Sequence, residues 1–305
     1  MTGLTDFITE ASWADIFLIW FAIVDDAYTA LEAHYGGWRR RGPEPEFSDS
    51  EVITVAVIVD TYFHGHEDLG LTFLRQYHLD LFPKLLPPGQ FNQRRRELRL
   101  IIEQLRRYIN VVWGLIDPDD PYRLTDSAPI PACTYMRASR NQTIAGHEYF
   151  GVMRSRGAKL FGWRLYLSIT LEQVVEEWLL APAAPHDSKV MASLFEQARD
   201  LIVFGDGAFH DPGEATHLER SRDIQIWATP RRDACTPWPE GFRKDVTRLR
   251  RRIETALSVL VTVFNIEAPG SRSLDGCVAR IATRMLAYTL AFITGPLLAQ
   301  LKTPN

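Results

Sequence analysis

Three acidic residues occupy positions where carboxylates could act together. Asp126 lies at the end of a short expected strand, residues 122 to 127, and Asp206 follows the apolar run 201 to 204, which is typical of a buried strand. Glu254 lies inside a basic segment that is expected to be helical. Carboxylates at the ends of adjacent strands meet at one edge of an α/β sheet, where ligand sites form. The three residues are therefore candidates for a single site.

Such a site implies divalent cations. Three converging carboxylates repel one another unless cations neutralise them, and hard ions such as Mg²⁺ or Mn²⁺ prefer oxygen ligands. Gly205 and Gly207 flank Asp206 and leave room for close approach by backbone or phosphate. Two ions about 4 Å apart can activate a water or hydroxyl and stabilise a leaving oxygen in phosphodiester chemistry. The residues thus predict a two-metal site that acts on phosphodiesters.

Each acid also has an ordinary structural interpretation. Asp126 before Ser127 could be a turn residue, Asp206 could belong to a glycine loop, and Glu254 could form a helical ion pair. His186 and Asp187 are expected to cap a helix rather than to bind metal. The joint occurrence of the three acids favours a site over three separate structural roles.

Charge is divided unevenly along the 305 residues. The net charge is −4, but residues 1 to 120 hold 11 Lys/Arg against 19 Asp/Glu, whereas residues 121 to 305 hold 23 against 19. Six basic residues fall within ten positions around the candidate helix: Arg243, Lys244, Arg248, Arg250, Arg251 and Arg252. Arg231 and Arg232 precede them. Neutralising phosphates supplies most non-specific affinity for nucleic acid, so this stretch predicts a phosphate-binding stripe.

The first 115 or so residues indicate helices. Ser12 with Asp15, and Ser48 with Glu51, have the spacing of helix N-caps. After prolines at 83, 87 and 88, a long helix is expected from about 92 to 115, with Arg94, Arg95 and Arg96 near its N-terminus. These arginines are candidates for DNA contact; the alternative is a solvated basic face. Trp238, on an aromatic and basic loop, could stack on an unpaired base or be partly buried.

After an acidic turn at 116 to 121 the pattern becomes that of a mixed sheet with helices packed on it. The expected strands are 122–127, 149–155, 163–170, 174–180, 201–204 and 224–228, and the expected helices are 189–199, 212–220, 243–264 and 274–301. No apolar run is judged long enough to span a membrane, the N-terminus lacks a secretory signal, and the three cysteines form no close pair. We expect a cytoplasmic, nucleoid-associated protein.

Several blocks of the sequence together resemble the DDE insertion-sequence transposases, and most closely insertion-sequence family 982. The blocks are Thr125-Asp126-Ser127 to Pro131, Phe161-Gly162-Trp-Arg164, Pro185-His186-Asp187, Phe204-Gly205-Asp206-Gly207-Ala-Phe209, and Arg250 to Leu260 around Glu254. The resemblance extends over nearly the whole chain. Its specificity comes from the order of the blocks and from the acidic spacings, 206 − 126 = 80 and 254 − 206 = 48.

The resemblance implies an RNase H-like α/β catalytic domain at 119–305, including the C-terminal helix, behind an all-helical domain at 1–118 that recognises DNA ends. Asp126 would bridge two Mg²⁺ or Mn²⁺ ions, with Asp206 and Glu254 each holding one. Arg250, Arg248, Lys244 and Arg251 would hold phosphates. Where related transposases carry Tyr and Lys around the catalytic Glu, this chain has Thr247 and Val261.

The implied function is a transposase that cuts the ends of its element and joins them to target DNA. Its partners would be the terminal inverted repeats, the target DNA and further copies of the chain in a homodimer or larger complex. Two alternatives remain: an RNase H-like, structure-selective nuclease that cuts without joining, and a retired transposase that only binds DNA.

Overall fold

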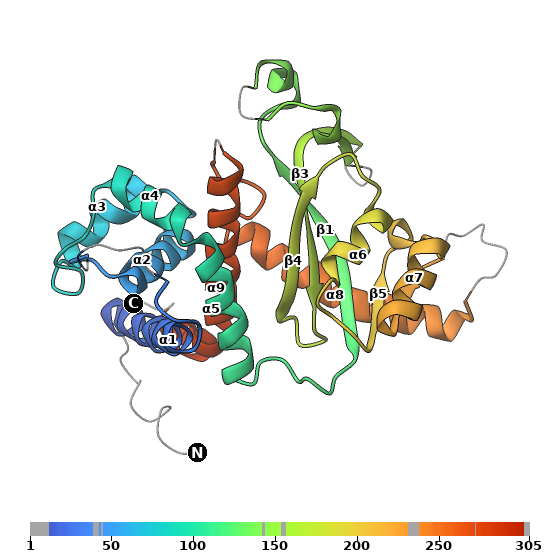
Figure 1. Ribbon diagram of the computed structural model, residues 1–305, viewed down its shortest axis with the longest axis horizontal. Coiled ribbons are helices and arrows are strands. Elements are labelled where there is room, and N and C mark those ends of the chain that lie inside the picture. Colours follow the sequence, from blue (N-terminus) through green and yellow to red (C-terminus); the bar gives the residue numbers. More distant parts are fainter. Residues whose placement is uncertain are drawn as a thin grey trace. The chain divides into compact units, whose positions relative to one another are not determined.

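The computed structural model describes residues 12–38, 43, 45–141, 144–153, 157–230, 238–271 and 273–301. It contains two compact units (Figure 1). The helical unit comprises Met1–Trp113, Val263–Asn265 and Leu274–Asn305. The sheet unit comprises Gly114–Thr262 and Ile266–Ser273.

In its described residues, the helical unit contains six helices. They are α1 (Trp13–Tyr35), α2 (Asp49–Tyr62), α3 (Glu67–Tyr77), α4 (Pro88–Glu97), α5 (Arg99–Val112) and α9 (Leu274–Leu301). Both expected N-caps are confirmed as capping boxes. At α2 the Glu51 amide donates to Ser48 Oγ at 3.1 Å, and the Ser48 amide donates to Glu51 Oε2 at 2.6 Å. These reciprocal bonds satisfy two amides that the helix itself leaves without partners.

The last helix packs within the helical unit, whereas the sequence analysis grouped it with the catalytic domain. α9 packs against α2 and α5 and contributes fully buried residues such as Ile281, Met285 and Leu286. Over Leu274–Gly295 it is long and apolar enough to cross a membrane, but 72% of its apolar window is buried, as is usual for a core helix. A fragment ending near residue 118 would expose the surfaces of α2 and α5 that α9 covers.

The long helix expected from 92 to 115 is two helices, α4 and α5, which meet at Leu98. Arg94, Arg95 and Arg96 therefore lie in the last turn of α4, where cations interact favourably with the helix dipole, and not at a helix N-terminus. Arg95 is 1% exposed. It is bonded to Asp60, to Thr283 at 3.2 Å and to Glu67 at 3.1 Å.

Arg94 and Arg95 are engaged in contacts within the helical unit, which argues against their role as DNA contacts. Arg94 donates to Phe47 O and to Asp49, which ties the end of α4 to the start of α2. Arg95 is buried and cannot reach a DNA groove. Only Arg96 of the three is exposed.

The sheet unit contains a mixed six-stranded sheet, as expected. Its strands are β1 (Tyr122–Pro131), β2 (Phe150–Met153), β3 (Ala158–Ile169), β4 (Val175–Pro182), β5 (Leu201–Gly205) and β6 (Ile224–Ala228). The order is β2-β3-β1-β5-β6, with β4 also pairing with β3. β1 pairs antiparallel with β3 and parallel with β5, and β5 pairs parallel with β6.

Helices pack on this sheet. α6 (Met191–Leu194) and α7 (Pro212–Arg222) lie in front of it in the view of Figure 1, and α8 (Glu240–Thr262) passes behind it. Val203 of β5 and Tyr166 of β3 share a buried cluster with residues of α6 and α7. The expected helix over 189–199 is shorter: a 3-10 turn, Asp187–Val190, leads into the single turn of α6.

β1 is longer than expected, so Asp126 lies inside the strand and not at its end. The strand continues to Pro131 through antiparallel pairing with β3, with Pro131 opposite Gly162. Pro129 and Pro131 lie within this extension, although proline cannot donate a ladder hydrogen bond. The recorded pairing with β5 ends at Leu124, so the prolines lie where only one side of β1 is paired.

Candidate active site

Asp126 and Asp206 lie near each other, the first inside β1 and the second directly after the neighbouring strand β5. Leu124 of β1 pairs with Phe204 of β5 in parallel register. Asp126 lies two residues after Leu124 within β1, and Asp206 lies two residues after Phe204, as the first residue beyond β5. The sequence-based expectation that these two carboxylates come together is thus matched by the register of the sheet.

Gly205 lies in a tightly packed position. A Cβ built there would lie 3.0 Å from Thr125 Cγ2 and 3.1 Å from a ring carbon of Phe209. The Asp206 side chain accepts a 2.8 Å hydrogen bond from the Ala208 amide and so caps the turn Gly207–Phe209. This fixes the carboxylate at the end of β5.

The environment of Asp126 disfavours its charge. Burial raises the pKa of this carboxyl to about 6, and the carboxylates of Asp206 and Asp187 contribute to the increase. The Ser127 amide, which donates to Asp126 Oδ1 at 2.8 Å, and the Arg250 guanidinium act in the opposite direction. A carboxylate held in a buried position beside another carboxylate is typical of functional sites, because it gains from a cation.

This shift predicts a stabilising substitution. The pKa is higher in the folded than in the unfolded chain, so the folded state binds more protons between about pH 4 and pH 6 and loses stability as pH rises through that window. Asp126→Asn removes the charge, so at pH 7.5 without metal we expect the variant to be more stable than the wild type, by on the order of 2 kcal/mol. Below about pH 4 the two proteins should unfold at the same denaturant concentration. Urea titrations across pH measure this.

α8 supplies a positive charge to the same site. Its residues Val246, Ile253, Ala256 and Leu260 are buried, and the helix packs against β1 and β5. Arg250 lies at the border of this buried face. Its Nε is buried without a hydrogen-bond partner among the described residues, and its charge acts on Asp126. A buried donor without a partner beside two carboxylates is suited to a bound anionic group such as a phosphate oxygen.

Glu254 lies one helical turn after Arg250 and is exposed. Residues four apart lie close together on a helix surface, so Glu254 is adjacent to the arginine that faces Asp126. Within the described residues, no three or more His, Cys, Asp or Glu side chains are grouped closely enough to hold a metal ion. The structure thus brings Asp126 and Asp206 together, but it does not place Glu254 in the same cluster.

The donor set nevertheless fits a divalent cation. Two carboxylates lie near each other, and that of Asp206 contributes to the raised pKa of Asp126. Oxygen donors of this kind match Mg²⁺ or Mn²⁺, whereas no cysteine or histidine cluster suited to a softer ion occurs in the described part of the chain.

The outer side of α8 forms a basic surface, which we call the α8 ridge. It borders a depression of about 430 Å³ and consists of Glu240, Arg243, Lys244, Thr247, Arg248 and Arg251. Lys244 pairs with Glu240 at 2.7 Å, whereas Arg248 and Arg251 have no ion pair among the described residues. Glu254 follows three residues after Arg251, so the ridge leads directly to the third acid.

Trp238 is half-buried in an aromatic cluster. Its ring centroid lies 5.1 Å from that of Phe242 and 6.1 Å from that of Trp227. This packing supports the alternative of a partly buried residue over that of a base-stacking residue. Arg231 and Arg232 lie outside the described residues.

Asp187 is a candidate site residue that sequence reasoning treated as a helix cap. The cap is in fact His186, whose Nδ1 accepts from the Ser188 amide at 3.4 Å. The Asp187 Oδ1 accepts from Tyr166 OH at 2.9 Å and from Arg164 Nη1 at 3.4 Å. Its charge reaches Asp126. Arg164 and Asp187 both lie in motif blocks that the sequence analysis found. Their contact could not be predicted from the sequence, because it depends on tertiary structure.

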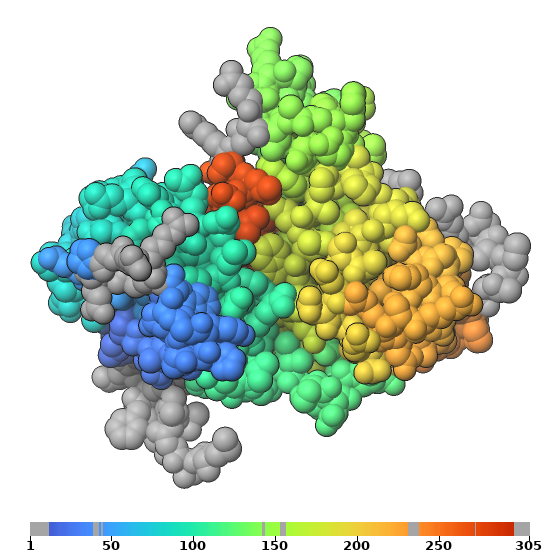
Figure 2. Space-filling model, in the orientation of Figure 1, coloured from blue at the N-terminus to red at the C-terminus, as the bar shows by residue number. Residues whose placement is uncertain are grey.

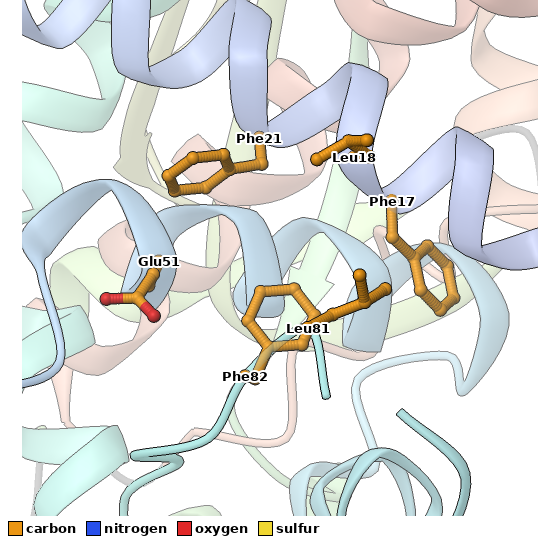
Figure 3. Close-up of a pocket in the computed structure, with 6 residues that line it drawn as sticks. All are labelled: Phe17, Leu18, Phe21, Glu51, Leu81 and Phe82. Atoms are coloured by element: carbon orange, nitrogen blue, oxygen red, sulfur yellow. The ribbon is translucent and has the colours of Figure 1, made fainter. Parts of the chain in front are cut away.

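A separate apolar cavity in the helical unit has no comparable chemistry. It measures about 120 Å³ and is lined by Phe17, Leu18, Phe21, Glu51, Leu81 and Phe82 (Figure 3). Glu51 is its one charged residue and is occupied in the α2 capping box. The chemistry-bearing residues therefore lie in the sheet unit.

Comparison with known proteins agrees with this location. No curated protein matches the chain. The family described as Transposase DDE domain matches residues 123–290, which span Asp126, Asp206 and Glu254. This match covers more than half of the chain and begins one residue into β1. The chain therefore belongs to the DDE transposase family, whose members act in DNA transposition and recombination.

Proposed function

We propose that this protein is an insertion-sequence transposase that cleaves DNA at the ends of its element and joins the freed 3′ hydroxyl to target DNA. The observation that carries the proposal is the pair formed by Asp126 inside β1 and Asp206 directly after β5, together with Arg250, whose charge acts on Asp126 and whose buried Nε has no partner among the described residues. The order and spacing of the motifs favour insertion-sequence family 982 within the DDE transposases. An RNase H-like arrangement of the catalytic unit is consistent with the mixed sheet and its flanking helices.

In this proposal the three acids hold two divalent cations, Mg²⁺ or Mn²⁺. When bound, such ions activate an attacking water or hydroxyl and stabilise the leaving oxygen. Asp126 is fixed inside β1 and Asp206 by its turn, so neither carboxylate has to be ordered during the reaction. Arg250 holds a phosphate oxygen through its Nε, which has no partner among the described residues.

Glu254 completes the site through its place on α8. It is exposed and follows the α8 ridge, so DNA lying on Arg248 and Arg251 would reach it directly. We propose that the binding of DNA and cations brings its carboxylate to the Asp126–Asp206 pair.

DNA contact by the α8 ridge can be tested through salt dependence. We expect Arg248→Ala and Arg251→Ala each to weaken duplex binding equally for all sequences and to reduce the slope of log K against log salt by about 0.9. Arg220→Ala, an exposed arginine on α7, is the matched control and should leave the slope unchanged. Unchanged slopes for both ridge variants would show that Arg248 and Arg251 are solvent-exposed residues that do not contact DNA phosphates.

The remaining parts of the proposal concern partners. The helical unit recognises the terminal inverted repeats, with the exposed Arg96 as its remaining arginine candidate, and two or more copies of the chain assemble on the paired ends.

The deciding experiment incubates the purified chain with DNA carrying the repeats that flank its gene, a target plasmid and Mg²⁺. Joined products support a transposase. Cutting without joining would indicate a nuclease, and binding alone would indicate a retired transposase.

A further inference from the structure

A projecting part of the sheet unit carries exposed aromatic and basic side chains outside the active site. It contains the turn Tyr135–Arg140 and strand β2, and its light green surface stands out from the rest of that unit in Figure 2. Tyr135 is 39% exposed, Phe150 37% and Met136 92%. Large apolar side chains gathered at a surface mark an interaction site more often than scattered ones do.

Three rings and one cation form a connected group, which we call the aromatic platform: Tyr135, His147, Phe150 and Lys159. The Tyr135 and Phe150 centroids lie 5.8 Å apart with their planes at 85°, and His147 lies 6.5 Å from Phe150. Lys159 Nζ lies 5.3 Å from the Tyr135 centroid. Cross-strand pairing fixes the group, because Phe150 pairs with Phe161, which is buried, and Val152 pairs with Lys159.

The charge around the platform is positive. Between residues 132 and 161, the described charged residues are Arg137, Arg140 and Lys159 against Glu148 alone. Neither arginine has an ion pair in the described part of the chain, and Lys159 has only its contact with Tyr135. This excess occurs on a chain whose net charge is −4. The complementary partner is therefore a polyanion.

The combination of rings and cations distinguishes among polyanions. Duplex DNA needs only the cations, because its bases already stack on one another, whereas an unpaired strand offers base faces to exposed aromatic rings. The platform also lies at a useful distance from the site. Phe150 of the platform pairs with Phe161 of β3. Asp126 pairs with Leu167, which lies six residues further along β3. Six strand residues span about 20 Å, roughly the rise of six stacked nucleotides.

We propose that the aromatic platform binds an unpaired DNA strand about six nucleotides from the bond that is cut, with a base stacked on Tyr135 or Phe150 and phosphates held by Arg137 and Lys159. The distance to the cut rests on the proposed function; the binding of the strand does not. No catalytic group lies on the platform, so strand binding and cleavage can be lost separately.

The test uses the full chain and fluorescence anisotropy with two probes, a 20-nucleotide oligothymidylate and a 20-base-pair duplex. Tyr135→Ala is expected to weaken oligothymidylate binding roughly tenfold, since a stacked base contributes strongly to affinity, and to leave duplex binding within about twofold. Tyr135→Phe keeps the ring and should retain binding. Lys159→Met should reduce the salt slope for oligothymidylate by about 0.7. Tyr77→Ala removes a similarly exposed ring from the helical unit and serves as the matched control.

Three results would overturn the proposal: unchanged oligothymidylate binding by Tyr135→Ala, an equal loss with the duplex, or a change in oligomeric state without a change in DNA affinity. The last would show that the platform contacts a second copy of the chain. Asp126→Asn should bind oligothymidylate as the wild type does. If the wild type binds it through Tyr135 but never cleaves DNA, the proposed function fails and the strand-binding site stands.

Discussion

Asp126→Asn, Asp206→Asn and Glu254→Gln are each expected to lower DNA cleavage and joining by at least about 10³-fold. Each substitution keeps the size of the side chain but removes a negative charge that a divalent cation needs, and the charge stabilisation lost amounts to several kcal/mol. The fold and DNA binding should persist, because none of these carboxylates forms an ion pair in the described structure. Strand-transfer assays in Mg²⁺ measure the effect.

Asp223→Asn is the matched control for this series. Asp223 is exposed and ends α7 in a left-handed conformation with φ of 55°, which asparagine also tolerates. It should retain full activity. Near-normal strand transfer by any one of the three site variants would show that its residue is not part of the site.

Asp60→Asn is expected to destabilise the protein by about 3 to 5 kcal/mol. Asp60 is fully buried and faces two arginines of the helical unit, Arg95 and Arg284, the latter at 3.6 Å. Glu67, which pairs with Arg95 at 3.1 Å and with Arg280 at 2.9 Å, would then be the remaining acid for three largely buried guanidinium groups. Uncompensated charge in the interior is costly, so the loss should be large.

Urea unfolding measures this change in the free energy of unfolding. Asp26→Asn, on the exposed side of α1, makes the same chemical change without a buried partner and should have little effect. If Asp60→Asn and Asp26→Asn shift the unfolding midpoint equally, the cluster does not stabilise the helical unit.

Local signals in the sequence were reliable where local chemistry decides the structure. The capping boxes at Ser12 and Ser48 mark helix starts because the bonds that define them lie within four residues. The boundaries of β6, Ile224–Ala228, are also those predicted from the sequence. The mixed sheet followed from the alternation of strand and helix patterns.

Long-range packing decided the features that could not be predicted. The membership of α9 in the helical unit depends on surfaces of α2 and α5 that lie far away in sequence. Arg95 resembled a DNA contact because its acidic partners, Asp60 and Glu67, are about 30 positions away. The extension of β1 depends on β3, which covers its prolines from one side.

The candidate site shows the same division. The sequence predicted that Asp126 and Asp206 lie close together, because parallel strands end at a common edge of a sheet. The register between β1 and β5 agrees with this prediction. It did not reveal the contact between Asp187 and Arg164, which joins two motif blocks within the sheet unit. The spacing of the three acids also did not predict that Glu254 is exposed and lies outside the Asp126–Asp206 pair.

The most direct test of the proposed cation site is calorimetric titration of the full chain with Mn²⁺. This measurement requires no knowledge of the terminal repeats. Wild type and Asp223→Asn should bind Mn²⁺, whereas Asp126→Asn and Asp206→Asn should lose that binding. Mn²⁺ binding of equal strength by all four proteins would contradict the assignment of Asp126 and Asp206 as the cation site, as would its absence from the wild type.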